Sequence, residues 1–513
     1  MSWSCWIPGS FSVAAVKRWT LPATAVLVTV AVLAPLAAPG YVLSYDMVFV
    51  PHQPLRADLI APSATLPRAV PQDALVSLAS VIAPGWLIQR VVLVAILLLA
   101  ALGAGRLVPT ERLAPRLIAA VGYAWTPFLA ERLLLGQWGL LLAYGSLPWI
   151  VMACRRDQGS TWKLLAAAAP AAVTPTGGLI AFGTVLVLAP RKAWLPALLN
   201  APWLIATALS QADGTSDPAG AAAFAARGND WTGPIGALLG TGGIWNSQTT
   251  LPSRSSPLAP LGTLLLLALA VAGWRLLRER WPGPMAVRLL VLAGGGFLLA
   301  ALAVLPGGRS LLEWAVTALP GAGVLRDGQK FLIPYALILC LCAALGAERA
   351  GSRPVLVGAL LLPLVVQPDL AYGAAGRLRP VSYPADFAAV ARIVEDAPGE
   401  VVSLPFAGYH TYPWNHSRTV IDPLPRFVDA DVVMDDRLLV GDRAIAGESR
   451  RADQIRDALA AGKPLAALGM RWVVVQRVEG EPPVPPGALA GLRMVHAGTD
   501  LQLYENGSSQ RSY

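Results

Sequence analysis

Long apolar runs recur along most of the chain and constrain its fold more than any other feature. A run of about 20 apolar residues is long enough to cross a bilayer as a helix. Such runs follow one another over residues 1–369, where charged residues are sparse, and charges become frequent afterwards. The pattern predicts a polytopic α-helical membrane bundle over 1–369, a small α/β domain over 370–506 and a disordered tail over 507–513.

The apolar runs predict about ten membrane spans. We expect straight helices over residues 20–38, 87–104, 114–130, 137–153, 193–209, 258–274, 288–306, 331–348 and 354–367. The run 164–189 differs, because Thr174-Pro-Thr-Gly-Gly178 interrupts it and a straight helix tolerates such a break poorly. We expect a broken helical hairpin here, lying against protein or a water-filled cavity.

Arginine and lysine cluster in short segments between the runs, which is typical of cytoplasmic loops. The clusters lie at 17–18, 106–116, 155–163, 191–192, 275–288 and 349–353. They account for much of the net charge of +9, so the expected partner is the lipid bilayer and no nucleic acid. This orientation predicts a multi-pass plasma-membrane protein whose C-terminal domain is extracytoplasmic. The loop after the first helix, the turn 131–136 and the loops 210–257 and 307–330 are expected on the same outer side.

The first outer loop carries two carboxylates, Asp46 and Asp58. Asp46 lies just beyond the first helix among apolar residues, where partial desolvation favours a general base. We therefore predict that Asp46 is the catalytic residue and that Asp58 faces the substrate cavity. The alternative is that Asp46 is an ordinary turn or cap residue.

Two further segments expected on the outer side place charged residues at the depth of the membrane. The turn between the runs 114–130 and 137–153 holds Glu131, Arg132 and Gln137, and ionisable groups at such depth normally pair or face a cavity. We predict that they line the substrate cavity, the alternative being a charged pair that caps the turn.

The segment from Leu325 to Phe331 places Arg326, Asp327 and Lys330 before the next helix. Basic residues normally favour the cytoplasmic side, so cations on the outer side predict a bound anion such as a lipid phosphate. We predict that Asp327 lines the substrate cavity. The alternative is that Arg326 and Lys330 snorkel to outer-leaflet head groups.

Aromatic residues cluster in the C-terminal domain. Tyr409, Tyr412 and Trp414 fall within ten residues of His410 and His416. Aromatic faces with polar rims are common carbohydrate surfaces, so these three aromatics are candidate acceptor-binding residues. The alternative is a loop packed against its own domain or the bundle. No third ligand accompanies the two histidines, so no metal site is expected.

These motifs resemble those of polytopic GT-C superfamily glycosyltransferases. The resemblance rests on the Asp-bearing first loop, the stretch from Trp125 to Gly139 and the segment from Leu325 to Phe331. It covers about the first 370 residues and is greatest with the arabinofuranosyltransferase-like envelope proteins of actinobacteria.

The resemblance implies inverting transfer of a sugar from a polyprenyl-phosphate donor to an envelope glycan acceptor at the outer side. Asp46 matches the base of this family, while Arg326 and Lys330 match a basic segment that meets the donor phosphate. Many relatives carry paired acidic residues in the first loop, whereas here Tyr45 and Met47 flank Asp46. Neither a metal ion nor another cofactor is therefore expected. Two alternatives remain open: a transporter or flippase of lipid-linked glycan that uses the break at 174–178, and a non-catalytic envelope-assembly scaffold.

Overall fold

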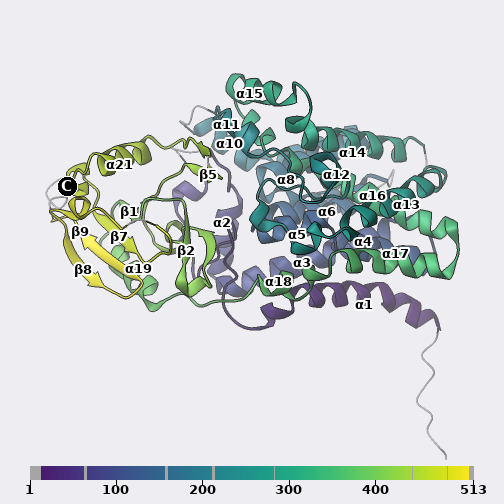
Figure 1. Ribbon diagram of the computed structural model, residues 1–513, viewed down its shortest axis with the longest axis horizontal. Coiled ribbons are helices and arrows are strands. Elements are labelled where there is room, and N and C mark those ends of the chain that lie inside the picture. The colour runs from purple at the N-terminus through teal and green to yellow at the C-terminus, as the bar shows by residue number, and fades with distance from the viewer. Residues whose placement is uncertain are drawn as a thin grey trace, which may run out of the picture.

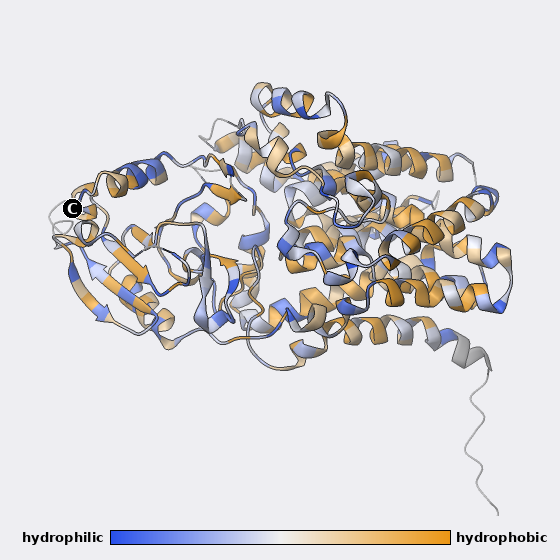
Figure 2. Cartoon of the chain, in the orientation of Figure 1, coloured by the Kyte–Doolittle hydropathy of each residue, from blue (hydrophilic) through white to orange (hydrophobic). Residues whose placement is uncertain are grey.

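The computed structural model describes residues 13–62, 66–155, 160–210, 214–281, 283–441, 443–481 and 483–507. The expected disordered tail lies outside these residues from 508 on. The chain forms a helical lobe and a smaller lobe that contains the strands (Figure 1). Apolar residues dominate the helical lobe, whereas the smaller lobe mixes apolar and polar residues, as Figure 2 shows. This contrast matches the composition shift near residue 370.

The helices of the larger lobe follow the apolar runs. They are α1 Val13–Leu33, α3 Gly85–Leu107, α4 Leu113–Ala124, α5 Pro127–Leu134, α6 Trp138–Arg155, α7 Thr161–Ala168, α8 Pro175–Leu188, α9 Trp194–Leu199, α10 Ala201–Leu209, α13 Leu258–Arg280, α14 Met285–Ala301, α16 Ile333–Ala350 and α17 Arg353–Val366. Within the described residues, five helices are long and apolar enough to cross a membrane, or six if Arg353–Val366 and Pro368–Gly376, bent by 63°, form one span. The chain is a multi-pass membrane protein, and the count of about ten spans stays a prediction.

Two expected straight helices are each divided. The run 114–130 forms α4 and α5, because Pro127 disfavours helical backbone at Thr126, whose side chain instead caps α5 by accepting a hydrogen bond from the Leu129 amide. The run 193–209 forms α9 and α10, which meet at Asn200. Prolines near helix starts therefore interrupt runs that hydropathy alone reads as continuous.

The run 164–189 is broken, as the sequence predicts, but the break lies at 169–174, and Pro175 to Gly178 of the predicted segment begin α8. Helix α7 ends at Ala168, and α8 begins at Pro175 with Thr174 as its N-cap. The Thr174 hydroxyl accepts a 3.2 Å hydrogen bond from the Gly177 amide. This hydrogen bond satisfies one of the free amides at the start of α8. The role of the break as a hairpin tip stays a prediction.

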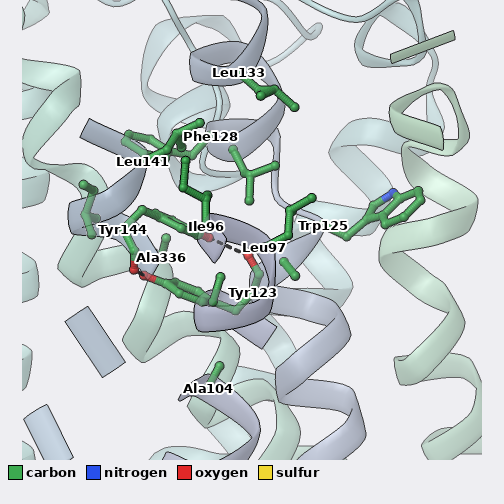
Figure 3. Close-up of a cluster of buried hydrophobic side chains, with 14 of the residues drawn as sticks. Ile96, Leu97, Ala104, Tyr123, Trp125, Phe128, Leu133, Leu141, Tyr144 and Ala336 are labelled. Atoms are coloured by element: carbon green, nitrogen blue, oxygen red, sulfur yellow. Dashed lines mark hydrogen bonds between the residues drawn. The ribbon is translucent and has the colours of Figure 1, made fainter. Parts of the chain in front are cut away.

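Two stacked tyrosines join α4 to α6 in the core of the bundle. The rings of Tyr123 and Tyr144 stack at 4.1 Å between centroids, and each hydroxyl donates to the other residue's carbonyl oxygen, at 2.9 and 2.7 Å. The ring of Phe128 continues the stack from α5 (Figure 3). These contacts fix the position of α5 relative to its neighbours.

The smaller lobe contains a five-stranded sheet of order β4-β1-β7-β9-β8. The strands of this lobe are β1 Val401–Leu404, β2 Tyr409–Tyr412, β3 Arg418–Ile421, β4 Val432–Val433, β5 Leu438–Val440, β6 Arg443–Ile445, β7 Trp472–Gln476, β8 Arg493–Ala497 and β9 Leu501–Glu505. Strands β4, β1 and β7 run parallel, whereas β9 is antiparallel to β7 and β8. The apolar pattern of 370–506 predicts helices near 386–395 and 450–461 and strands near 400–404, 471–476 and 501–504, and each of these elements is confirmed within one or two residues.

Two helices cover opposite faces of the sheet. Helix α19 Ala385–Asp396 packs Phe387 and Val390 on Val401 and its neighbours. Helix α21 Arg450–Ala460 packs against the adjacent residue, Val402, together with Val473. Successive strand residues point to opposite faces, so both faces of this sheet are buried.

Short helices lie between the long elements. They are α2 Gln72–Ser80, α11 Ala219–Ala223, α12 Gly233–Leu239, α15 Gly308–Ala318, α18 Ala371–Gly376 and α20 Leu424–Phe427. In α18, Tyr372, Gly373, Ala374 and Ala375 have φ between 53° and 63°, which makes one left-handed turn where the two lobes meet.

The loop after α1 lies between the two lobes. The Tyr41 amide donates to the Val381 carbonyl at 2.7 Å. Farther along, the Tyr45 amide donates to Thr419 at 2.9 Å and its carbonyl accepts from the Ile421 amide at 3.0 Å. The loop thereby adds backbone pairing to the β2–β3 hairpin, so the first loop and the C-terminal lobe are joined at the place where Asp46 lies.

Candidate functional site

Asp46 belongs to the loop after α1 and lies against the turn that joins α5 to α6. The Asp46 amide donates a 3.0 Å hydrogen bond to the Leu135 carbonyl. At Gly136, φ is +81° and an added Cβ would lie 2.2 Å from the Met47 amide nitrogen. Only glycine permits both this backbone conformation and this close approach. The turn therefore places the first-loop carboxylate directly beside the polar residues of α5 and α6.

Two uncharged donors hold the Asp46 carboxylate. The Tyr409 hydroxyl donates to Oδ1 at 2.6 Å, and Gln137 Nε2 donates to Oδ2 at 3.2 Å. Burial and the Asp46 charge raise the pKa of Tyr409 well above its usual range, so its phenol stays protonated and can donate. The half-buried carboxylate thus has a defined orientation without a direct ion pair to an arginine.

Arg132 connects this carboxylate to the start of α16. Its guanidinium donates to Gln137 Oε1 at 2.7 Å and makes a bidentate pair with Asp327, at 2.7 and 2.9 Å. It also donates to Gln329 Oε1. The Arg132 side chain is fully buried, and a buried bidentate pair with further hydrogen bonds is a rigid arrangement.

Lys330 ends the chain of contacts that starts at Tyr409. Its Nζ lies 3.6 Å from Asp327 Oδ2, and its side chain keeps 25% exposure. Burial acts to raise the pKa of Asp327, but the charges of Arg132 and Lys330 hold it at about 2. Asp327 is therefore ionised, and it has two cationic neighbours. We call the set Asp46, Arg132, Gln137, Asp327, Gln329, Lys330 and Tyr409 the polar cluster.

Glu131 faces the long loop 210–257. Its Oε1 accepts a 2.6 Å hydrogen bond from Asn229 Nδ2, and its Oε2 accepts from Gln329 Nε2 at 3.0 Å and from the Ile244 amide at 3.2 Å. Burial raises the pKa of Glu131 to about 7, against the lowering effect of Arg254. The loop 210–257 therefore packs onto the α5–α6 turn at this point.

Arg326 and Lys330 have different partners, although the sequence predicts a shared role. The Arg326 guanidinium lies 5.0 Å from the centroid of the Phe224 ring. Burial and the nearby charge of Arg68 lower the pKa of Arg326 to about 10. Lys330 pairs with Asp327, so it is the cation of the two that belongs to the polar cluster.

Asp58 lies apart from the polar cluster. It forms an ion pair with Arg56 at 2.7 Å, and its side chain is 49% exposed. Arg56 also donates to the carbonyls of Pro425, Val428 and Ala430 in the C-terminal lobe. Asp58 thus orients an arginine that joins the first loop to that lobe.

Of the three aromatic candidates in the C-terminal lobe, only Tyr409 belongs to the polar cluster. Tyr412 is buried, stacks on Trp414 at 4.9 Å and donates to Gln476 Oε1 at 2.9 Å. Trp414 packs on Tyr383 as well. These contacts favour the packed-loop alternative for Tyr412 and Trp414, whereas Tyr409 joins Asp46.

Sequence reasoning missed two contributors to this region. Gln329 lies inside the segment from Leu325 to Phe331, but no role was predicted for it because its side chain is neutral. Asn229 belongs to a loop of low charge with no motif. A buried amide that bridges charged partners has no spacing signature, since its partners come from distant elements. Within the described residues, no group of three or more His, Cys, Asp or Glu side chains is placed to hold a metal ion.

The arrangement matches solved structures in fold. No family model and no curated protein matches the sequence. The structure of the arabinofuranosyltransferase AftD from mycobacteria is similar with a TM-score of 0.58 and 18% identity, over 96% of this chain and 40% of that one. A mutant form of AftD gives a TM-score of 0.57 and 18% identity, over 96% and 42%. The chain thus spans less than half of the protein it resembles, and the resemblance expected from its motifs is confirmed: it has the fold of a mycobacterial arabinofuranosyltransferase.

Proposed function

We propose that this protein is a membrane glycosyltransferase of the cell envelope. In this proposal it transfers a sugar from a polyprenyl-phosphate donor to an envelope glycan or glycolipid at the outer side of the membrane. The fold shared with AftD supports the reaction class. The observation that carries the proposal is the Asp46 carboxylate, which is oriented by two neutral donors and connected through buried contacts to the partly exposed Lys330.

The polar cluster suits inverting transfer. Asp46 takes the proton of the acceptor hydroxyl as that oxygen attacks the anomeric carbon. The bond from the anomeric carbon to the phosphate oxygen breaks on the opposite side, and its electron pair leaves with the phosphate. Lys330 stabilises the charge that develops there, and Arg326 adds positive potential.

The positions of the basic residues support an outer-side reaction. At one end of the bundle, Arg280 pairs with Glu348 at 2.8 Å and donates to the Pro109 carbonyl. The ends of α3, α13 and α16 that meet there carry the clusters expected in the cytoplasm. The polar cluster lies at the α5–α6 turn and at the start of α16. The start of α16 is the end opposite to the one that carries the basic cluster.

The decisive experiment compares Asp46→Asn with the unaltered chain. In membranes supplied with a labelled polyprenyl-phosphate sugar, the substitution should lower the transfer rate about 10²- to 10⁴-fold at equal expression, the typical contribution of a general base. Asp453→Asn is the matched control, because that carboxylate is 61% exposed on α21. Full activity of Asp46→Asn would refute the proposal.

A further inference from the structure

A largely apolar cavity lies among α4, α13, α16 and α17, and no residue of the polar cluster lines it. It encloses about 700 Å³ including its open mouth. Ile118, Leu269, Cys340, Ala343 and Ala359 line its deeper part. Because this volume includes open solvent, the enclosed part is narrow, and its mostly apolar walls suit one alkyl chain.

One end of the cavity is polar and incompletely paired. Thr241, Arg254 and Gln367 line it, and each of these residues is at most 2% exposed. Among the described residues, Thr241 Oγ1, Arg254 Nε and both side-chain polar atoms of Gln367 are buried without a hydrogen-bond partner. Buried polar atoms are normally paired, and leaving them unpaired is costly. Their concentration at one end of one cavity indicates a ligand that supplies the missing bonds.

The charges at this end favour a neutral ligand group. Asp230 forms an ion pair with Arg254 at 3.1 Å. The guanidinium therefore already has a carboxylate partner, which disfavours a phosphate or carboxylate head as a second one. The amide of Gln367 offers both a donor and an acceptor, which suits a hydroxyl or an ester.

The cavity opens toward the side of the bundle. Gly262, Leu266 and Leu269 line it along α13, a length of about 10 Å at 1.5 Å per residue. Leu266 and Leu362 at this side are half-buried, and Leu264 and Leu361 next to them are exposed apolar residues. An alkyl chain can therefore enter between α13 and α17 from the bilayer.

We propose that this cavity binds one alkyl chain of a membrane lipid whose polar end is a neutral hydroxyl or ester group. The polar end pairs with Gln367 and Thr241, and the chain fills the space lined by α4, α13, α16 and α17. The site differs in chemistry from the proposed donor site, which requires cations for a phosphate. The inference does not depend on the proposed transfer activity.

Photolabelling of the purified full chain tests the proposal. The probe is a monoacylglycerol with a diazirine in its chain, and labelled peptides are identified by mass spectrometry. We expect labels on α13 and α17, competed by unlabelled monoacylglycerol. Lysophosphatidic acid, which carries the same chain with a phosphate, should compete at least tenfold less well, because the Arg254 guanidinium is already paired with Asp230.

Two substitutions act on the two ends of the site. Gln367→Leu removes two hydrogen bonds and should weaken labelling about tenfold, while the thermal midpoint of the empty protein stays equal or rises, since an unpaired polar group is lost. Gly122→Leu should abolish labelling by filling the cavity, because an added Cβ there meets its nearest atom, Cys340 Sγ, at 3.8 Å. Gly294→Leu is the matched control, a helical glycine with no atom within 4 Å of an added Cβ.

Three outcomes would overturn the proposal. Labelling unaffected by both Gln367→Leu and Gly122→Leu would mean that the probe binds elsewhere and that water fills the polar end. Equal or better competition by lysophosphatidic acid would mean that the site takes anionic heads. Equal loss of labelling in Gly294→Leu would trace the effect to the helix substitution itself.

Discussion

The hydroxyl of Tyr409 donates a 2.6 Å hydrogen bond to the Asp46 carboxylate, although 363 residues separate the two in the chain. The C-terminal lobe therefore supplies part of the polar cluster. It does so through the β2–β3 hairpin, which also pairs with the backbone of Tyr45. This lobe is thus a structural component of the proposed site as well as a separate sheet.

Removing this hydroxyl should impair the proposed reaction. A hydrogen bond to a charged group contributes about 1.5–3 kcal/mol, so Tyr409→Phe should lower the transfer rate about 10- to 100-fold. Tyr504→Phe, which removes a hydroxyl that contacts Gln502 in β9, is the control. An unchanged rate in Tyr409→Phe would contradict the assigned role.

The Arg132–Asp327 pair should behave as one unit in stability measurements. Asp327→Asn leaves a buried guanidinium with one ionic partner fewer, and Arg132→Met leaves a buried carboxylate, so each should lower the free energy of unfolding by about 3–5 kcal/mol. The double substitution Arg132→Met with Asp327→Leu should be less destabilising than the sum of its parts. Urea unfolding in detergent measures the coupling, and strict additivity would show that the pair is not energetically linked.

Gly136 should tolerate no side chain. Gly136→Ala places a Cβ 2.2 Å from the Met47 amide nitrogen and forces a side chain into left-handed backbone. It should both destabilise the protein and lower the transfer rate by displacing Asp46. Gly462→Ala separates the two effects, since φ there is +64° but no atom lies within 4 Å of the added Cβ. If both substitutions lower activity equally, the close approach to the first loop is unimportant.

The C-terminal lobe should lose stability in mild alkali. His410 is buried; burial alone lowers its pKa, but the nearby charges of Asp422 and Glu481 and the hydrogen bond with Glu481 raise it to about 9. The folded state keeps this proton up to about pH 9, whereas the unfolded chain releases it near pH 6.5. The free energy of unfolding should therefore fall by about 3 kcal/mol between these pH values, with its full contribution present below pH 6.5.

Hydrogen exchange of the β2–β3 hairpin as a function of pH measures this effect. His410→Asn should remove the pH dependence, together with the stabilisation at low pH. His416→Asn is the control, because that exposed histidine has φ of 53° and asparagine tolerates left-handed backbone. A pH dependence that survives in His410→Asn would assign the effect to another group.

Much of the membrane lobe could be predicted because apolar runs report directly on helices in lipid. The division at Thr126 could not be read from hydropathy, since Leu129, Ala130 and their neighbours are as apolar as a continuous span would be. In the C-terminal lobe the buried strands near 401 and 472 were clear. Strands β2, β3 and β8 were not, because their polar and aromatic residues resemble those of loops.

The candidate site shows the same limit. Local motifs brought Arg132, Gln137, Asp327 and Lys330 into consideration, and the structure joins them to Asp46 through hydrogen bonds and an ion pair. The link to Tyr409 could not be foreseen, because it depends on how the first loop pairs with a hairpin near the other end of the chain. Contacts across such separations are set by tertiary packing, which one sequence does not encode in its spacing.

The pairing of Tyr45 with the β2–β3 hairpin also bears on when the site forms during synthesis. The backbone partners of Tyr45 are Thr419 and Ile421, which leave the ribosome only after the bundle helices have been made. A nascent chain therefore carries an Asp46 whose loop is unpaired on one side. The proposed activity arises only once residues 419–421 have been made, so chains terminated before them would insert into the membrane without acting on its lipids.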